Sequence, residues 1–305
     1  MSRTFRRYPG LNQFASRHNF NWNEVLAPRS IIARMSIEQT GSGEKASRFL
    51  SMAWRVSLGI GYCAAFPLFV LGSLALTSVL SFGSIPRYDA VLFLCLSFQI
   101  GMLVLRMETP REFATIFLFH AMGTALEMFK VNHGGWYYPE PSWFKVMGVP
   151  LYSGFMYASV GSFILACWKR FDVHVNAFPP MVAVVPLVVA TYANFFTNYW
   201  IWDMKPALLL LAIALFFHTR IIGNVGASTV PIRLPFIFLS LGPVVWCAEN
   251  VGTWLGSWEY PRQAGGWVAV PPDKLLSWTV LVMVSFLVVA MVRKDSIRSG
   301  ESDNK

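Results

Sequence analysis

Residues 127–139 read Glu-Met-Phe-Lys-Val-Asn-His-Gly-Gly-Trp-Tyr-Tyr-Pro, and residues 249–261 read Glu-Asn-Val-Gly-Thr-Trp-Leu-Gly-Ser-Trp-Glu-Tyr-Pro. Both stretches fit one pattern, E-x6-G-x-W-x-Y-P, and they lie 122 residues apart. A Val-Pro pair follows each stretch, at 149–150 and at 270–271. Identities at fixed spacing in matching contexts indicate an internal repeat.

The rest of the sequence has the composition of a membrane protein. The 305 residues are 55% hydrophobic and 13% charged, whereas soluble domains carry about 25% charged residues. The mean hydropathy is +0.47. This composition excludes disordered, collagen-like and disulfide-rich classes, and it argues against a soluble enzyme.

Apolar runs of about 20 residues, the length that crosses a bilayer core, predict the fold class. We expect an all-α polytopic membrane helix bundle, because only helices satisfy every backbone group in so apolar a sequence. About eight transmembrane helices would form two parallel four-helix repeats. The predicted spans are 57–82, 89–105, 113–132, 147–168, 178–198, 206–222, 234–254 and 275–292.

The distribution of basic residues predicts the orientation. With the N-terminus inside, cytoplasmic segments hold 19 Lys or Arg and the opposite side holds 6. This excess follows the positive-inside rule and predicts an N-in/C-in topology. Without the N-terminal tail the counts are 10 and 6, which favour the same orientation. We expect a multi-pass protein of the inner (plasma) membrane, with an organelle membrane as the alternative.

Four segments follow from these patterns. They are a flexible basic cytoplasmic tail at 1–48, a first four-helix repeat at 49–170, a second at 171–292, and a polar C-terminal tail at 293–305. The basic tail has no apolar core of the signal-peptide type, and we interpret it as a solvated segment attracted to anionic lipid. The alternatives are that this segment is an organelle transit peptide or that translation starts at Met35.

The repeat places two carboxyl groups in equivalent apolar helices. Glu127 and Glu249 each lie late in a predicted helix that runs outward. A carboxylate in such a helix is costly unless it is paired, protonated or facing a cavity, so it marks a functional site. Pseudo-symmetry should bring the two together near the bundle axis. A protonated carboxylic acid in a dry pocket is what acid catalysis on an apolar substrate requires, and we predict that these two residues are catalytic.

Aromatic residues follow both glutamates at identical spacing, and two interpretations of them remain open. They would form an interfacial belt, or they would line a pocket mouth and stabilise a cation with their ring faces. Histidines and asparagines within the spans complete the predicted substrate-binding set, although structural packing also explains them. The set comprises Trp136, Tyr138, Trp258, Tyr260, His133, His120, Asn250 and Asn194.

Several site classes have no signature in the sequence. There is no phosphate-binding glycine loop, dinucleotide fingerprint or nucleophile elbow, and no zinc spacing. We therefore predict no cofactor and no metal. The basic tail lacks a nucleic-acid motif, so the expected partners are membrane lipids and a lipid or isoprenoid substrate. The oligomeric state stays open.

Residues 120–141 and 148–162, with Ala193-Asn-Phe-Phe and Ala248-Glu-Asn-Val-Gly-Thr, resemble the YoaT-type bacterial membrane proteins, family 817 among the domains of unknown function. The resemblance covers roughly residues 50–292. It implies a multi-pass fold in a membrane and brings no established activity.

A fainter similarity links Glu249-x-x-Gly-x-x-x-Gly, Tyr260, Val270-Pro271 and Leu276-Ser-Trp to membrane carotenoid hydratases and, loosely, to heterodimer-type lycopene cyclases. Those enzymes protonate or hydrate prenyl double bonds within the bilayer. The paired acids that follow the proline in the cyclases are absent, since Leu151-Tyr152 and Pro272-Asp273 stand there. Among the acidic residues of these enzymes, this similarity therefore assigns a role only to the glutamates.

Three hypotheses about function follow. The first is an intramembrane acid/base enzyme that hydrates, isomerises or cyclises an isoprenoid or another lipid. The second is a structural or assembly protein whose glutamates bind loop backbone groups. The third is a proton-coupled small-molecule transporter, which predicts a site near the membrane midplane.

Overall fold

The computed structural model describes residues 47, 49–225 and 228–293. The chain divides into two compact units, Met1–Arg55 and Val56–Lys305. The second unit contains the strands and most of the helices among the described residues. Apart from residues 47 and 293, the predicted tails at 1–48 and 293–305 lie outside the described residues, as does Met35.

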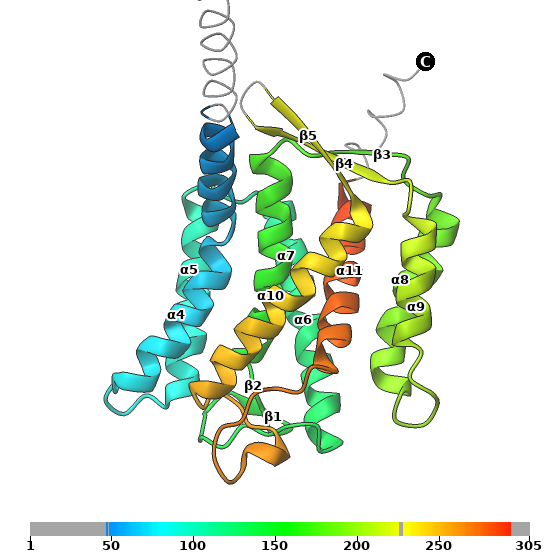
Figure 1. Ribbon diagram of the computed structural model, residues 1–305. Helices are drawn as coiled ribbons and strands as arrows, with labels where there is room; N and C mark the ends of the chain where they lie inside the picture. Colours follow the sequence, from blue (N-terminus) through cyan, green and yellow to red (C-terminus); the bar gives the residue numbers. More distant parts are fainter. Residues whose placement is uncertain (1–46, 48, 226–227, 294–305) are drawn as a thin grey trace, which may run out of the picture. The chain divides into compact units, whose positions relative to one another are not determined.

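Helices dominate the unit Val56–Lys305, and each of the eight predicted spans overlaps at least one. A helix over Phe49–Cys63 precedes α4 and is bent by 59° against it. A short 3-10 helix, η1, covers Pro261–Gln263. The longer helices (Figure 1) are α4 Ala65–Val79, α5 Arg87–Val104, α6 Pro110–Asn132, α7 Ser153–Arg170, α8 Met181–Thr197, α9 Lys205–Leu215, α10 Leu234–Trp254 and α11 Lys274–Val292.

Fewer helices than predicted meet the length and apolarity that a membrane span needs. Within the described residues these are α5, α10 and α11, or four spans if the bent pair Phe49–Cys63 and α4 counts as one. The apolar helices α8 and α9 are shorter. Helix α6 has 23 residues, but both ends carry charged side chains.

Two small antiparallel sheets mark opposite ends of the bundle (Figure 1). Strands β1 (Lys145–Val146) and β2 (Val149–Pro150) form a hairpin at what we call the hairpin end. Strands β3 (His174–Asn176), β4 (Arg220–Val225) and β5 (Ser228–Arg233) form a sheet in that order at the sheet end.

The second sheet corrects the predicted span 206–222 and adds short strands to a mostly helical fold. Helix α9 ends at Leu215, and the chain enters β4 at Arg220. β-Branched side chains favour strands over helices, and Ile221 and Ile222 stand here, followed by Gly223. In β4, Ile221 pairs with Val175 of β3 and with Ile232 of β5. The apolar run therefore contains a short helix and a strand.

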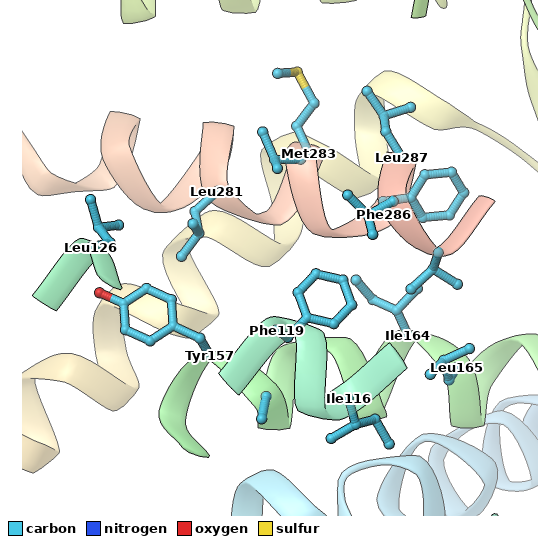
Figure 2. Close-up of a cluster of buried hydrophobic side chains, with 14 of the residues drawn as sticks. Ile116, Phe119, Leu126, Tyr157, Ile164, Leu165, Leu281, Met283, Phe286 and Leu287 are labelled. Atoms are coloured by element: carbon cyan, nitrogen blue, oxygen red, sulfur yellow. The ribbon is translucent and has the colours of Figure 1, made fainter. Parts of the chain in front are cut away.

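Close packing of α6 on α7 and α11 forms the centre of the bundle (Figure 2). A Cβ added at Gly154 would lie 2.3 Å from the hydroxyl oxygen of Thr124, and one added at Gly161 would lie 2.3 Å from the ring of Phe119. Small residues let helix backbones approach closely in apolar surroundings. Phe119 packs with Phe286 and Leu287 of α11 in the buried cluster.

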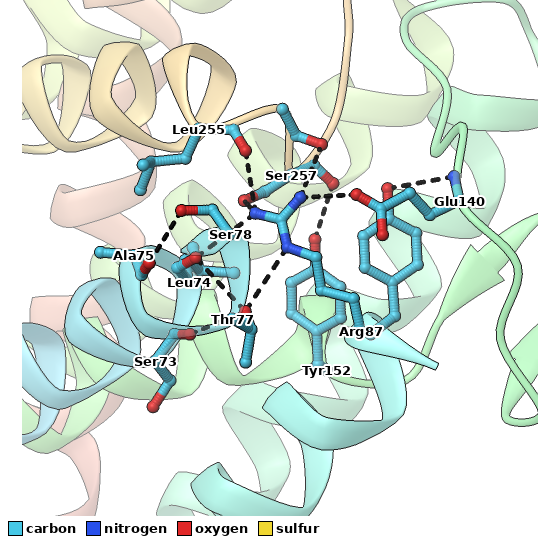
Figure 3. A network of polar contacts seen from close by, with 12 residues as sticks. Ser73, Leu74, Ala75, Thr77, Ser78, Arg87, Glu140, Tyr152, Leu255 and Ser257 are labelled. Carbon is cyan, nitrogen blue, oxygen red and sulfur yellow. Dashed lines mark hydrogen bonds and ion pairs between the residues drawn. The ribbon is translucent and has the colours of Figure 1, made fainter. Parts of the chain in front are cut away.

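Arg87, the first residue of α5, joins three segments at the hairpin end (Figure 3). Its guanidinium donates to the carbonyl oxygens of Leu255 (2.8 Å) and Gly256 (3.4 Å) at the end of α10, and to that of Leu74 (3.3 Å) in α4. It also forms an ion pair with Glu140 at 2.5 Å. The side chain is 13% exposed, so one buried cation holds these segments together.

The helices of the two halves pack in matching pairs. Helix α4 contacts α5 and α7, while α8 contacts α9 and α11. Helix α6 packs on α7 as α10 packs on α11, and α6 contacts α8 as α10 contacts α4. Not every helix contact has a matching partner of similar extent, since α5 contacts α6 in the first half and α9 contacts α11 in the second.

Candidate functional site

The glycine of the repeated pattern ends the helix that carries each glutamate. Gly134, two residues after the last residue of α6, has φ +73°, and Gly256, two residues after α10, has φ +68°. This left-handed conformation is typical of the residue that terminates a helix, and glycine adopts it without a steric penalty. The turn reverses the chain and brings the following Trp and Tyr back beside their own helix.

The two loops meet at equivalent positions of the pattern. Tyr137 and Glu259, each ten residues after a glutamate, form an antiparallel bridge in which both N–H···O bonds measure 2.9 Å. The Tyr137 hydroxyl also donates to the Glu259 carboxylate at 2.5 Å. Because this bond pattern is reciprocal, the two loops approach each other symmetrically at this point.

Glu127 is buried and accepts three hydrogen bonds from aromatic side chains. The indole N–H of Trp136 (2.7 Å) and the hydroxyl of Tyr138 (2.8 Å) donate to its Oε2, and the hydroxyl of Tyr157 in α7 donates to its Oε1 (2.7 Å). The residue is 3% exposed. Because donors from three side chains reach both oxygens, the carboxyl group is fixed in one orientation.

Glu249 is held in a matching way with one donor fewer. The hydroxyl of Tyr260 donates to Oε1, and the indole N–H of Trp278 in α11 donates to Oε2 at 2.5 Å. Trp258 stands where Trp136 stands in the first half, but its ring lies against Gly252. The two carboxyl groups therefore differ in their surroundings.

The two sets of donors contact each other across the halves. The rings of Trp136 and Tyr260 lie 5.8 Å apart, and those of Tyr157 and Trp278 lie 6.3 Å apart. The ammonium group of Lys274 lies 5.1 Å from the Tyr260 ring centre and 5.8 Å from that of Trp136. A donor to one glutamate thus packs on a donor to the other.

Glu127 and Glu249 line one cavity of about 790 Å³. This volume falls in the range of about 300–1,000 Å³ that is usual for small-molecule sites. Trp136, Tyr260 and Trp278 share the lining. Most of the wall is apolar and comes from α4, α7, α10 and α11; its members include Val70, Leu71, Leu74, Val160, Phe163, Leu241, Val244, Val245, Leu281 and Val282.

The predicted aromatic residues lie inside the fold and not on its surface. Tyr138, Trp258 and Tyr260 are at most 6% exposed, and Trp136 is partly buried. The exposed tryptophans among the described residues at this end are Trp143, Trp200, Trp202, Trp254 and Trp267.

The remaining predicted binding residues lie outside the cavity wall. His120 packs on Phe155, and His133 is exposed and stacks on Phe129. Asn194 is buried in α8. Asn250 accepts from the Val270 N–H at 2.9 Å, which ties the loop after η1 to α10.

Burial raises the pKa of the Tyr138 and Tyr260 hydroxyls well above the ordinary value of 10, and the charge of the adjacent glutamate adds to the effect. Both phenols therefore remain protonated donors at every physiological pH.

Tyr157 and Trp278 are site residues without an assigned role in the sequence analysis. Each lies seven residues after the proline of its Val-Pro pair, at Pro150 and Pro271. If the two repeated stretches are aligned beyond the Val-Pro pair, with one residue fewer in the second half, Tyr157 and Trp278 fall at equivalent positions. This alignment would have identified both. The residue types differ, but both carry a hydrogen-bond donor on an aromatic ring.

Another buried carboxyl group lies between α5 and α6. Glu108 is 8% exposed and accepts from Gln99 and, at 3.2 Å, from Ser162. Burial, helped by the charge of Glu112, raises its pKa to about 7, although Ser162, Gln99 and Lys169 favour the charged form. This carboxyl group therefore titrates near neutral pH.

We expect the stability of the protein to fall as the pH rises from about 4.5 to 7. The folded state binds more protons than the unfolded state in this window, because the Glu108 pKa is raised on folding. The full shift corresponds to about 3 kcal/mol, and solvent screening of this incompletely desolvated group lowers the expected effect to on the order of 2 kcal/mol. In detergent, the midpoint of thermal unfolding should fall more steeply between pH 5 and 8 for the wild type than for Glu108→Gln. Parallel curves would contradict this assignment.

Comparison with known proteins places the chain in a family. A family model described as a protein of unknown function, DUF817, matches residues 53–286. The chain is 42% identical over 241 residues to the uncharacterized protein YoaT of Bacillus subtilis (strain 168), which covers 78% of this chain and 91% of the relative. No solved structure matches. The chain belongs to the DUF817 family.

Proposed function

We propose that the protein is an intramembrane acid–base enzyme acting on an isoprenoid or another lipid, with Glu127 and Glu249 as its catalytic pair. The observation that carries the proposal is that both glutamates line one largely apolar cavity. An apolar pocket with a few convergent polar groups is the usual form of a small-molecule site.

The exposed surface supports a membrane location. Large apolar side chains point outward from several helices, among them Val79 of α4, Val182 of α8 and Phe236 of α10, which are 78%, 80% and 64% exposed. Apolar surface on this scale suits contact with lipid. The five exposed tryptophans at the hairpin end would form an interfacial belt there. A plasma-membrane location with the N-in/C-in topology and eight spans is part of the proposal.

Two parallel four-helix repeats would explain the matching helix contacts. A two-fold axis along the membrane normal would pass between Tyr137 and Glu259, which are equivalent in the pattern and bond reciprocally. It would also pass near Tyr157 and Trp278, which are equivalent and in ring contact. Such an arrangement brings one glutamate from each half to a shared cavity.

The cavity offers the groups that proton transfer to a double bond requires. One glutamic acid would donate its proton to an alkene carbon, and the aromatic ring faces would stabilise the resulting cation. The other carboxylate would then accept a proton, either from the neighbouring carbon in an isomerisation or from a water molecule in a hydration. The proton returned in either case balances the one donated.

A structural role is the second candidate. Two of the three donors to Glu127 come from the loop that directly follows its helix. The carboxyl group would then fix this loop against α6 without chemistry. Buried and fully hydrogen-bonded polar clusters do rigidify a fold.

Lipid profiles of cells distinguish the two roles. We expect cells that produce the protein to differ in a lipid or isoprenoid pool from cells that lack it, and cells with Glu127→Gln or Glu249→Gln to resemble those that lack it. Membrane levels of each variant are the control. If both variants, present at wild-type levels, give the wild-type lipid profile, the enzyme proposal fails.

A further inference from the structure

Three lysines line the same cavity at the hairpin end of the bundle. Lys130 lies in the last turn of α6, Lys205 begins α9 and Lys274 begins α11. These helix ends lie together at the end marked by β1 and β2 (Figure 1). The positive charges of Lys205 and Lys274 both act on Lys130, so the three ammonium groups are neighbours.

Lys130 and Lys274 form no ion pair within the described residues, although the charge of Asp203 acts on Lys130 and that of Lys274 acts on Glu249. Lys205, 7% exposed, forms an ion pair with Asp203 at 2.7 Å. Lys130 instead donates to the amide oxygen of Asn198 at 3.2 Å, and its ammonium lies 4.4 Å from the ring centre of Tyr199. Lys274 contacts the aromatic rings of the site. Unpaired charges close to one another are costly in a partly buried site, and a bound anion removes that cost.

Four acidic residues of the wall qualify this charge balance: Glu127 and Glu249 of the site, Asp203, which pairs with Lys205, and Asp273. Asp273 precedes Lys274, lines the cavity and is exposed. Water can therefore solvate its carboxylate, whereas Lys130 and Lys274 are partly buried. The rim keeps a positive side beside the aromatic pair Trp136 and Tyr260.

Polarity changes in layers with depth along α11. Lys274, Trp278 and Leu281 all line the cavity, and a helix rises about 1.5 Å per residue. The backbone of Trp278, whose indole binds Glu249, therefore lies about 6 Å along the helix from that of Lys274, and Leu281 lies about 10 Å along it. The order from the rim inward is ammonium, carboxyl with aromatic rings, and hydrocarbon.

We infer that the cavity binds a lipid with an anionic headgroup, a phosphate or a carboxylate, held between Lys130 and Lys274. Its hydrocarbon chain lies among α4, α7, α10 and α11. This inference rests on the proposed function, since it names the class of substrate on which the two glutamates act. A headgroup at the rim places the first carbons of the chain beside Glu127 and Glu249.

Two pairs of probes test the headgroup with the full-length protein in detergent. Farnesyl phosphate is compared with farnesol, and oleate with oleyl alcohol, by native mass spectrometry. We expect at least one anionic probe to bind tenfold or more tightly than its alcohol, with an affinity that falls at high salt. Preference for farnesyl phosphate identifies a phosphate headgroup, and preference for oleate a carboxylate. Equal affinity for acid and alcohol in both pairs overturns the inference.

Variants then assign the effect to the lysines. The double variant Lys130→Gln/Lys274→Gln should lose at least tenfold in affinity for the anionic probe and keep its affinity for the alcohol, which also reports on folding. Arginine at both positions should restore the anionic preference. Lys169→Gln at the far end of α7 removes one positive charge outside the cavity and should bind normally. Wild-type binding by the double variant overturns the inference.

The test of the headgroup site can fail or succeed independently of the test of the proposed function. The lysine variants are scored by probe affinity, whereas the glutamine variants at Glu127 and Glu249 are scored by the lipid profile of cells, so the two proposals have separate readouts. Binding that depends on the lysines without any change in the lipid profile rejects catalysis and keeps the headgroup site. A changed lipid profile without lysine dependence rejects the headgroup site alone.

Discussion

Replacement of Arg87 by methionine is expected to lower the free energy of unfolding by about 3 kcal/mol or more. Removal of one partner from a buried ion pair typically costs about 3–5 kcal/mol. Here the carbonyl oxygens of Leu255 and Leu74 lose their donor as well. The positive charge also stabilises the C-terminal end of α10, where the helix dipole is negative. Glu140 is 34% exposed and regains water, which keeps the cost near the lower limit.

Denaturant titrations of the purified protein in detergent measure this loss. The free energy of unfolding of Arg87→Lys should lie between those of the wild type and Arg87→Met, because one ammonium group cannot reach acceptors in three directions. Arg262→Met is the matched control: Arg262 is exposed and donates to one loop carbonyl at 2.8 Å, so a change within about 0.5 kcal/mol is expected. A loss at Arg87 no larger than at Arg262 would show that the network carries little stability.

The sequence predicted the parts of the site that depend on short-range patterns. The spacing from Glu127 to Tyr138 and from Glu249 to Tyr260 is eleven residues in both halves, and a helix end with a left-handed glycine converts this spacing into a contact. The small residues Gly154, Ala158 and Ser162 of α7 recur at four-residue intervals, and Gly154 lies on the face that packs on α6. Local geometry fixes both features.

Other parts depend on contacts between distant segments. Nothing near Lys130 in the sequence indicates Lys205 or Lys274, since the bundle alone brings these three helix ends together. Arg87 binds carbonyl oxygens 168 and 169 residues away, and carbonyl acceptors leave no trace in the side-chain pattern. The sequence did not predict strand β4 for another reason. Its isoleucines continue the apolar run that begins in α9, and hydropathy alone does not distinguish a strand from a helix.

Replacement of the two glutamates by leucine is expected to lower the free energy of unfolding by unequal amounts. Glu127→Leu leaves three buried donors without an acceptor, and each unpaired donor costs about 1–3 kcal/mol. Glu249→Leu leaves two. Burial of the leucine side chain offsets part of each loss. We expect Glu127→Leu to lower the free energy of unfolding by about 3–6 kcal/mol, and Glu249→Leu by at least about 1 kcal/mol less.

Glutamine at the same positions separates structure from chemistry. Its carbonyl oxygen can accept from the indole N–H, which only donates, and its amide N–H can donate to a tyrosine oxygen, which also accepts. Glu127→Gln and Glu249→Gln should therefore unfold within about 1 kcal/mol of the wild type. A catalytic pair loses its proton-transfer step in these stable variants, because an amide does not exchange a proton as a carboxyl group does. A purely structural pair keeps its function with glutamine and fails only with leucine, so the two substitutions together decide what the carboxyl groups are for.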